Sequence, residues 1–183
     1  GYINEKPLRM LCKVIDAANV DLKSFSEEVY QNLNGGHLEP VLRNLKILKE
    51  ENVWFEITNL VIPQWTDDFE MIREMCKWIY KNLGPNYPLH FSRFFPHYKL
   101  QYLPPTPIET LEKAREIAID EGLNFVYIGN VPLHPANNTY CPNCENLLIE
   151  RKGYNVKIIG LDLGSGSCKK CGEKIAGVWK LTY

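Results

Sequence analysis

The chain has 183 residues, of which 45% are hydrophobic and 23% charged, and its formal net charge is −1 at pH 7. This composition is ordinary for a globular protein, and it gives no overall attraction to nucleic acid or to an anionic membrane. No apolar run approaches the roughly 18 residues that a membrane-spanning helix needs, and the first residues lack a signal-peptide pattern. We therefore expect a cytoplasmic protein without a membrane partner.

Strand-like and helix-like segments alternate up to about residue 130. Strand patterns cover residues 17–22, 54–62, 90–95 and 124–128. Helices are expected over 26–33 (ended by Gly35 and Gly36), 41–50 (with Pro40 as first residue), 67–83 (capped by Thr66) and 108–121. This alternation predicts an α/β fold of parallel βα units. Four strands fit either part of a βα barrel or a small open sheet, and the pattern alone does not separate the two.

The sequence changes character after residue 130. Residues 131–138 form a connector that contains proline and asparagine, and short β-like runs follow at 147–150 and 156–161. We therefore expect two domains, one over residues 1–130 and a small one over residues 131–183.

Four cysteines in the second domain have the spacing of a metal site. Cys141 and Cys144 form a Cys-x-x-Cys pair, and 23 residues later Cys168 and Cys171 form another, followed by Gly172. Two such turns that face each other supply four thiolates to one tetrahedral ion, and Gly172 permits the left-handed turn. We expect structural zinc, with iron as the alternative, rather than two disulfides or a redox dithiol. Cys12 and Cys76 fall on apolar helix faces and are expected to be small buried side chains.

Polar residues gather at the carboxyl ends of three predicted strands, where parallel α/β proteins bind ligands. The three groups cover residues 20–24, 59–68 and 91–98. They contain Asp-Leu-Lys at 21–23, Val-Ile-Pro-Gln-Trp-Thr-Asp-Asp at 61–68 and Phe-Phe-Pro-His-Tyr at 94–98. Each group alone is compatible with plain surface.

Taken together and in this order, the three groups resemble the second half of glycyl-radical-enzyme activating enzymes such as the pyruvate formate-lyase activase. Those enzymes are radical S-adenosylmethionine (SAM) proteins built on a partial βα barrel. Tyr-Ile-Gly-Asn at 127–130, Asn-Thr-Tyr-Cys-Pro at 138–142 and Gly-Val-Trp at 177–179 resemble more specifically the radical SAM member of the AmmeMemoRadiSam group. The resemblance implies the second half of a radical SAM barrel followed by a zinc-ribbon-like module.

The resemblance also implies roles for particular residues. Asp21 and Lys23 match a motif that helps to hold SAM, and His97 matches a histidine that approaches SAM. Asn59 and Val61 fall where a strand lines the adenosine pocket.

In the family reaction, a [4Fe–4S] cluster on a Cys-x-x-x-Cys-x-x-Cys loop reduces SAM, and the resulting radical abstracts hydrogen from a protein or a small molecule. The sequence contains neither that loop nor the family's Gly-Gly-Glu segment. We therefore expect a C-terminal part that is inactive alone and carries no catalytic residue. Its partners would be its own missing N-terminal half, or a second copy bound at an exposed sheet edge. Memo-like and AMMECR-type proteins are further partners that the resemblance implies.

Two other functions remain open at this point. A zinc-ribbon module could bind nucleic acid or a protein through a modest basic patch, which acidic neighbours dilute: Arg151, Lys152, Lys157, Lys169 and Lys170. A hydrolase could use His90, His97 or His134 with Asp67 or Asp68, but the sequence has no nucleophile motif to support it.

Overall fold

The computed structural model describes residues 1–179 and divides the chain into two compact units, Gly1–Asn130 and Val131–Tyr183. We call the first the sheet unit and the second the cysteine unit. Within residues 1–179, no helix combines the length and the apolar character needed to cross a membrane.

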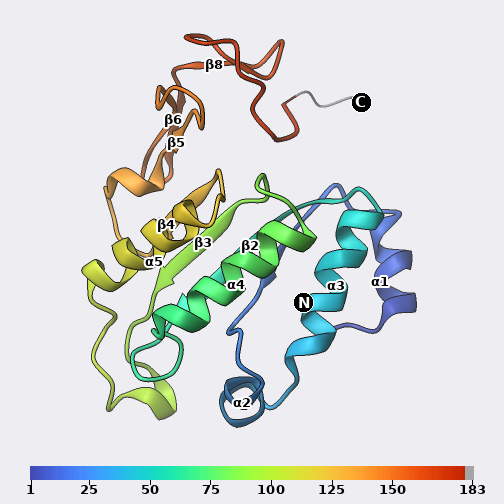
Figure 1. Cartoon of the computed structure of the whole chain (residues 1–183), viewed down its shortest axis with the longest axis vertical. Coiled ribbons are helices and arrows are strands. Elements are labelled where there is room, and N and C mark those ends of the chain that lie inside the picture. Colours follow the sequence, from blue (N-terminus) through green and yellow to red (C-terminus); the bar gives the residue numbers. More distant parts are fainter. Residues whose placement is uncertain (180–183) are drawn as a thin grey trace. The chain divides into compact units, whose positions relative to one another are not determined.

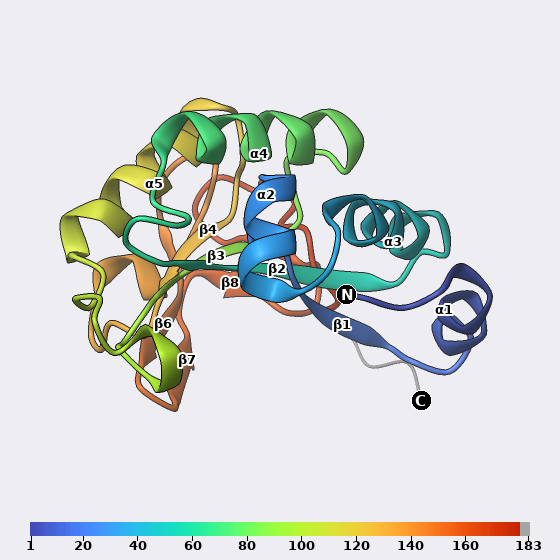
Figure 2. The same cartoon turned by 90° about the horizontal axis from the view of Figure 1, so that it is seen from below.

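The sheet unit is built on four parallel strands in the order β1-β2-β3-β4. Their bounds are β1 Ala17–Asp21, β2 Trp54–Val61, β3 Leu89–Arg93 and β4 Val126–Gly129. Successive strands are joined through α3 (Leu38–Glu50), α4 (Phe69–Asn82) and α5 (Ile108–Asp120), which all lie on one face of the sheet (Figures 1 and 2). The predicted parallel βα units are thus confirmed. The strands follow sequence order, and all the crossover helices lie on one face. This arrangement differs from a doubly wound sheet, in which helices cover both faces.

Shorter elements complete the sheet unit. Helix α1 (Glu5–Cys12) precedes β1, and α2 (Glu27–Val29) runs directly into a π-helical turn, Tyr30–Asn34. A single 3₁₀ turn, Tyr98–Leu100, follows β3. Among residues 1–179, β1 pairs with β2 only, so its other edge has no strand beside it.

Strand β2 shows how the sheet divides its two faces. Phe55, Ile57, Asn59 and Val61 are buried on the face that the helices cover, and the residues between them are half-buried on the other face. Full burial of an aliphatic or aromatic side chain contributes about 1.5–3 kcal/mol, so this alternation fixes the strand's orientation. We call the face without helices the uncovered face.

Two helix starts differ from the sequence prediction. Helix α3 begins at Leu38, so Pro40 is its third residue, because the Glu27 carboxylate accepts a hydrogen bond from the Leu38 amide at 2.9 Å. Helix α4 begins at Phe69 with Asp68 as its N-cap, since Asp68 Oδ1 accepts from the Met71 amide at 2.8 Å.

The predicted cap, Thr66, has a different task. It is buried, and its hydroxyl donates to the Leu60 carbonyl at 2.9 Å and accepts from the Ile62 amide at 2.7 Å. Thr66 therefore closes the loop after β2 instead of capping α4.

The cysteine unit contains a three-stranded antiparallel sheet in the order β5-β6-β7 and a two-stranded pair, β8-β9. The bounds are β5 Thr139–Tyr140, β6 Leu147–Lys152, β7 Asn155–Ile158, β8 Leu161–Asp162 and β9 Ser167–Cys168, with a 3₁₀ turn at Pro135–Asn137. The β6–β7 hairpin falls between the two cysteine pairs and overlaps both β-like runs found in the sequence.

Candidate functional site

Asp21 and Lys23 form an ion pair at the carboxyl end of β1. Lys23 Nζ lies 2.9 Å from Asp21 Oδ2, and both side chains are close to half exposed. Their loop is fixed through the main chain, because the Lys23 amide donates to the Tyr30 hydroxyl at 3.1 Å and the Leu22 amide to the Thr58 carbonyl at 3.0 Å. Burial raises the pKa of Tyr30 to about 12, so Tyr30 accepts this bond as a neutral phenol.

Asn59 and Val61 lie on the opposite side of the sheet from Asp21. Their exposed fractions are 1% and 0%. Asn59 Nδ2 donates to the Leu22 carbonyl at 2.8 Å, while its Oδ1 has no hydrogen-bond partner among the described residues. Neither side chain is open to a ligand here, and the part they play in an adenosine pocket stays a prediction.

His97 is exposed in the segment that follows β3. It precedes the 3₁₀ turn that begins at Tyr98, whose φ is 50°. Because the strands are parallel, the segments containing Asp21, Lys23 and His97 follow strand ends on the same edge of the sheet. We call this the carboxyl edge.

The loops along the carboxyl edge contain residues with strained backbone conformations. Gln64, Tyr98 and Asn130, which follow β2, β3 and β4, have φ values of 67°, 50° and 59°. Non-glycine residues in this region cost energy, and they gather at ligand-binding sites.

Thr106 links the ends of β2 and β3. Its hydroxyl is fully buried, donates to the Val61 carbonyl at 2.6 Å and accepts from the Phe94 amide at 3.0 Å. This role could not be predicted, because a threonine in a proline-rich loop has no signal of its own in the sequence.

A polar cluster on the uncovered face was also missed. His90 Nε2 lies 2.7 Å from Glu56 Oε2, and the His90 ring stacks on Tyr127 with 4.9 Å between centroids. Thr58 Oγ1 donates to Asn19 Oδ1 at 3.1 Å on the same face. His90 thus has Glu56 as its carboxylate partner, and Asp68 is used as a helix cap. These two residues therefore do not form a histidine–aspartate pair.

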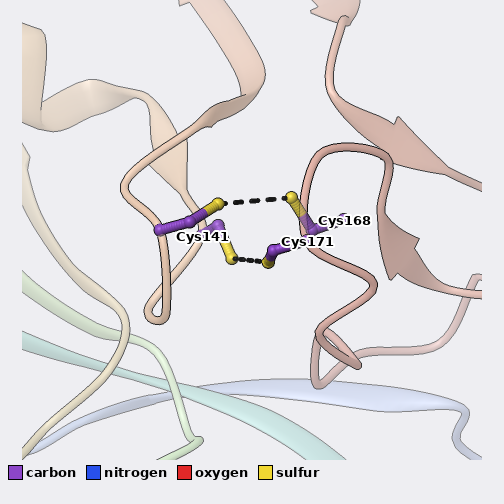
Figure 3. A group of neighbouring side chains, drawn as sticks. Cys141, Cys168 and Cys171 are labelled. Carbon is purple, nitrogen blue, oxygen red and sulfur yellow. Dashed lines mark hydrogen bonds between the residues drawn. The ribbon is translucent and has the colours of Figure 1, made fainter.

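The four cysteines of the cysteine unit converge as their spacing predicted. All four Sγ atoms lie within 4.8 Å of one another, with 3.6 Å between Cys141 and Cys171 and 3.7 Å between Cys144 and Cys168. Figure 3 shows Cys141 facing Cys168 and Cys171 from a separate loop. A tetrahedral ion with metal–sulfur bonds of about 2.3 Å requires sulfurs about 3.8 Å apart, whereas a disulfide bond is about 2.05 Å long. The geometry fits a four-thiolate metal site.

The two cysteine turns have matching hydrogen bonds. The Cys141 amide donates to the Asn146 carbonyl at 2.9 Å, and the Cys168 amide to the Glu173 carbonyl at 2.8 Å. The amides of Glu145 and Gly172 donate to the carbonyls of Cys141 and Cys168, both at 2.9 Å. This agreement between separate segments supports one site built from two copies of the same turn.

Backbone amides prepare two of the sulfurs for a cation. Burial of Cys168 opposes ionisation, but N–H groups of Cys171 and Lys170 point at its sulfur and lower its pKa to about 6. The Glu173 amide lowers the pKa of Cys171 in the same way. These donors stabilise thiolates, the form that binds metal. Burial raises the pKa of Cys141, and in Cys144 the Asn146 amide is outweighed by burial and by the neighbouring thiols, which raise the pKa to about 12.

The remaining two cysteines, Cys12 and Cys76, belong to the sheet unit. Cys76 is fully buried on α4, and burial raises its pKa to about 12. Cys12 is only half-buried at the end of α1, which corrects the expectation of full burial.

The basic residues near the cysteines are partly engaged within the unit. Arg151 Nη1 donates to the Thr139 hydroxyl at 2.8 Å, Lys169 Nζ donates to the Ile159 carbonyl at 3.2 Å, and Lys152 lies 3.0 Å from Glu150. The charge of Lys152 is thus paired with a carboxylate.

Comparison with known proteins gives related sequences and folds. The chain is 50% identical over 175 residues to an uncharacterized protein of Methanocaldococcus jannaschii, covering 96% of this chain and 52% of the relative. It is 31% identical over 127 residues to the pyruvate formate-lyase 1-activating enzyme of Escherichia coli K12, covering 64% of this chain and 52% of that enzyme. The chain thus spans about half the length of both curated relatives. No protein-family model matches it.

Two solved structures share its fold. A domain of pyruvate-formate lyase-activating enzyme from Bacteroides vulgatus superposes with a TM-score of 0.59 at 19% identity, over 69% of this chain and 75% of that one. A radical SAM methyltransferase from Sphaerobacter thermophilus gives 0.55 at 10% identity, over 78% of this chain and 41% of that one. The chain is therefore a distant homologue of pyruvate formate-lyase activating enzyme, and its fold is similar to that of radical SAM enzymes.

Proposed function

We propose that this chain is the C-terminal, SAM-binding part of a radical SAM enzyme of the AmmeMemoRadiSam group. Its reaction would be reductive cleavage of SAM, followed by hydrogen abstraction from a protein or a small molecule. The observation that carries the proposal is the Asp21–Lys23 ion pair of 2.9 Å at the carboxyl end of β1. It lies in a sheet whose strands follow sequence order with helices on one face, which is how a βα barrel is assembled.

The residues at the carboxyl edge fit a nucleoside cofactor such as SAM. The Asp21 carboxylate is exposed and can accept hydrogen bonds from ribose hydroxyl groups, and Lys23 holds that carboxylate in place. When bound, SAM would supply the radical that attacks the substrate. Asn59 would act indirectly, because it fixes the Leu22 carbonyl between the two charged residues.

The iron–sulfur cluster does not fit these residues. The cysteines are Cys12, Cys76, Cys141, Cys144, Cys168 and Cys171, and no three of them have the Cys-x-x-x-Cys-x-x-Cys spacing. In this proposal the cluster is bound by polypeptide outside these 183 residues. Zinc at the four cysteines would be structural, since four thiolates leave no open position.

The open edge of β1 suggests how such polypeptide would join. No strand among residues 1–179 pairs with this edge, so it can take up another parallel strand, from the remaining half of a barrel or from a second copy of the chain. Memo-like and AMMECR-type partners and a cytoplasmic location stay part of the proposal.

The proposal is tested by equilibrium dialysis of the purified chain with radiolabelled SAM. Binding should be saturable and should weaken about tenfold or more in Asp21→Asn, because a charge-assisted hydrogen bond is lost. Glu28→Gln removes an exposed acid nearby and serves as the matched control. No binding, or equal binding by both variants, would refute the role of Asp21.

A second measurement tests the part of the proposal that concerns the cluster. After anaerobic reconstitution with iron and sulfide, the chain alone should hold no stoichiometric [4Fe–4S] cluster and should release no 5′-deoxyadenosine from SAM under a strong reductant. Stoichiometric cluster assembly would show that the chain is self-sufficient.

A further inference from the structure

Arg93, a half-buried arginine at the carboxyl edge, has no anionic partner among the described residues. It is the last residue of β3 and pairs in register with Val61, the last residue of β2. Among residues 1–179, its side chain makes one hydrogen bond, from Nε to the Thr106 carbonyl at 2.8 Å, and no carboxylate lies within ion-pair distance. By contrast, Arg9 and Arg73 both pair with glutamates.

The position of the guanidinium follows from the hydrogen bonds of Thr106. The Thr106 hydroxyl bonds the Val61 carbonyl and the Phe94 amide, so Thr106 lies where β2 and β3 end. Arg93 bonds the carbonyl of this same residue. Its guanidinium is therefore at the carboxyl edge, two strands away from Asp21. Neighbouring strands are about 4.8 Å apart, so roughly 10 Å separates the ends of β1 and β3, and the register with Val61 places Arg93 on the helix-covered face, opposite to Asp21.

The surroundings hold Arg93 in one orientation. Its guanidinium carbon is 5.1 Å from the centre of the Phe95 ring, and the Asn130 amide Nδ2 donates to the Arg93 carbonyl at 3.0 Å. Nε is engaged, while Nη1 and Nη2 have no hydrogen-bond partner among the described residues. These two nitrogens donate to carboxylate or phosphate, often through paired bonds, and an arginine that is already fixed loses little freedom on binding.

We infer that Arg93 is an oxyanion-binding residue, which takes a carboxylate or phosphate group of the ligand bound over the carboxyl edge. Naming that ligand the substrate rests on the proposed function, whereas anion binding by Arg93 does not. The anionic group of such a ligand would lie at the end of β3.

The test is an NMR titration of the wild-type chain with inorganic phosphate and, separately, with acetate, while the arginine Nε–Hε signals are followed. We expect the Arg93 signal to shift and saturate with at least one anion, and the preferred anion distinguishes a phosphate from a carboxylate. Arg93→Lys keeps the charge but loses the planar fork. In this variant the anion-induced chemical-shift changes of the other signals should saturate only at about tenfold higher anion concentration. Lys113→Gln removes an exposed charge on α5 and should leave the titration unchanged.

An Arg93 signal that stays still, or that moves no more than those of the other arginines, would overturn the inference. So would an Arg93→Lys variant that binds as well as wild type. The wild-type titration is decisive by itself, even if the variant does not fold. SAM dialysis is independent of it, so failure of the proposed function and failure of this assignment can be told apart.

Discussion

Glu145 and Gly172 occupy the same position in two matching cysteine turns. Each follows the second cysteine of its pair, and their φ values are 57° and 79°. Each amide donates to the carbonyl of the first cysteine of its turn at 2.9 Å. Both turns therefore require a left-handed backbone conformation at this position, but only the second turn has a glycine, which adopts it without strain.

Substitutions at these two positions should have opposite effects. Glu145→Gly should stabilise the metal-loaded protein by about 1 kcal/mol, and Gly172→Ala should destabilise it by about 1–2 kcal/mol. A Cβ at Gly172 would meet no atom within 4 Å, so its cost is conformational rather than steric. Metal release during denaturant titration measures both changes. Glu173→Gly, at a residue without positive φ, is the control and should not stabilise.

Loss of one metal ligand should unfold the cysteine unit alone. Cys144→Ser should abolish stoichiometric zinc binding, because the folding of small four-thiolate modules depends on the metal. The sheet unit has its own core and should keep its helical circular dichroism signal. Elemental analysis would measure the zinc content, and limited proteolysis would detect unfolding of the cysteine unit. Cys12→Ser is the control outside the site. A variant with full zinc content would contradict the four-thiolate assignment.

Thr106→Val should destabilise the sheet unit by about 2–3 kcal/mol, because the change keeps the side chain's shape but leaves two backbone groups unpaired. These groups are the Val61 carbonyl and the Phe94 amide, which now share the buried Thr106 hydroxyl. Thr58→Val, which removes an exposed bond to Asn19, should cost below about 1 kcal/mol. Equal losses in denaturant-induced unfolding of the two variants would show that Thr106 does not link the strand ends as described.

The sequence was sufficient where a local pattern determines the structure. The alternation of Phe55, Ile57 and Val61 defined a strand, and the spacing of four cysteines defined a site. It was insufficient where a hydrogen-bond partner distant in the chain determines where an element begins. Leu38 starts α3 because Glu27 reaches its amide, so a rule that places Pro40 first chose the wrong boundary.

The candidate site shows the same division. Asp21 and Lys23 could be singled out because they stand together at the end of a strand pattern. The pairing of His90 with Glu56 depends on strand register, and the bond from Arg93 to Thr106 depends on a loop that returns to the end of β3. Neither feature has a sequence signature. The burial of Asn59 could have been foreseen, because it shares the parity of Phe55 and Ile57 along β2.

Glu27 should make stability depend on pH in the acid range. The Leu38 amide, then His37 and Gln31, hold its carboxylate and lower its pKa from the ordinary 4.5 to about 2. Because the folded state favours the ionised form, this contribution is complete above about pH 4.5 and is lost as the pH falls towards 2. The melting temperature of wild type should therefore exceed that of Glu27→Gln at about pH 6, and the two should converge near pH 2.

A matched control separates the charge of Glu27 from its packing. Glu28→Gln changes a neighbour whose side chain makes no hydrogen bond or ion pair among residues 1–179, and it should follow wild type at every pH. A constant gap between wild type and Glu27→Gln would mean that Glu27 acts through packing instead of through its charge. The predicted convergence at low pH arises only if the carboxylate itself holds the start of α3, because protonation removes the charge and leaves the shape of the side chain unchanged.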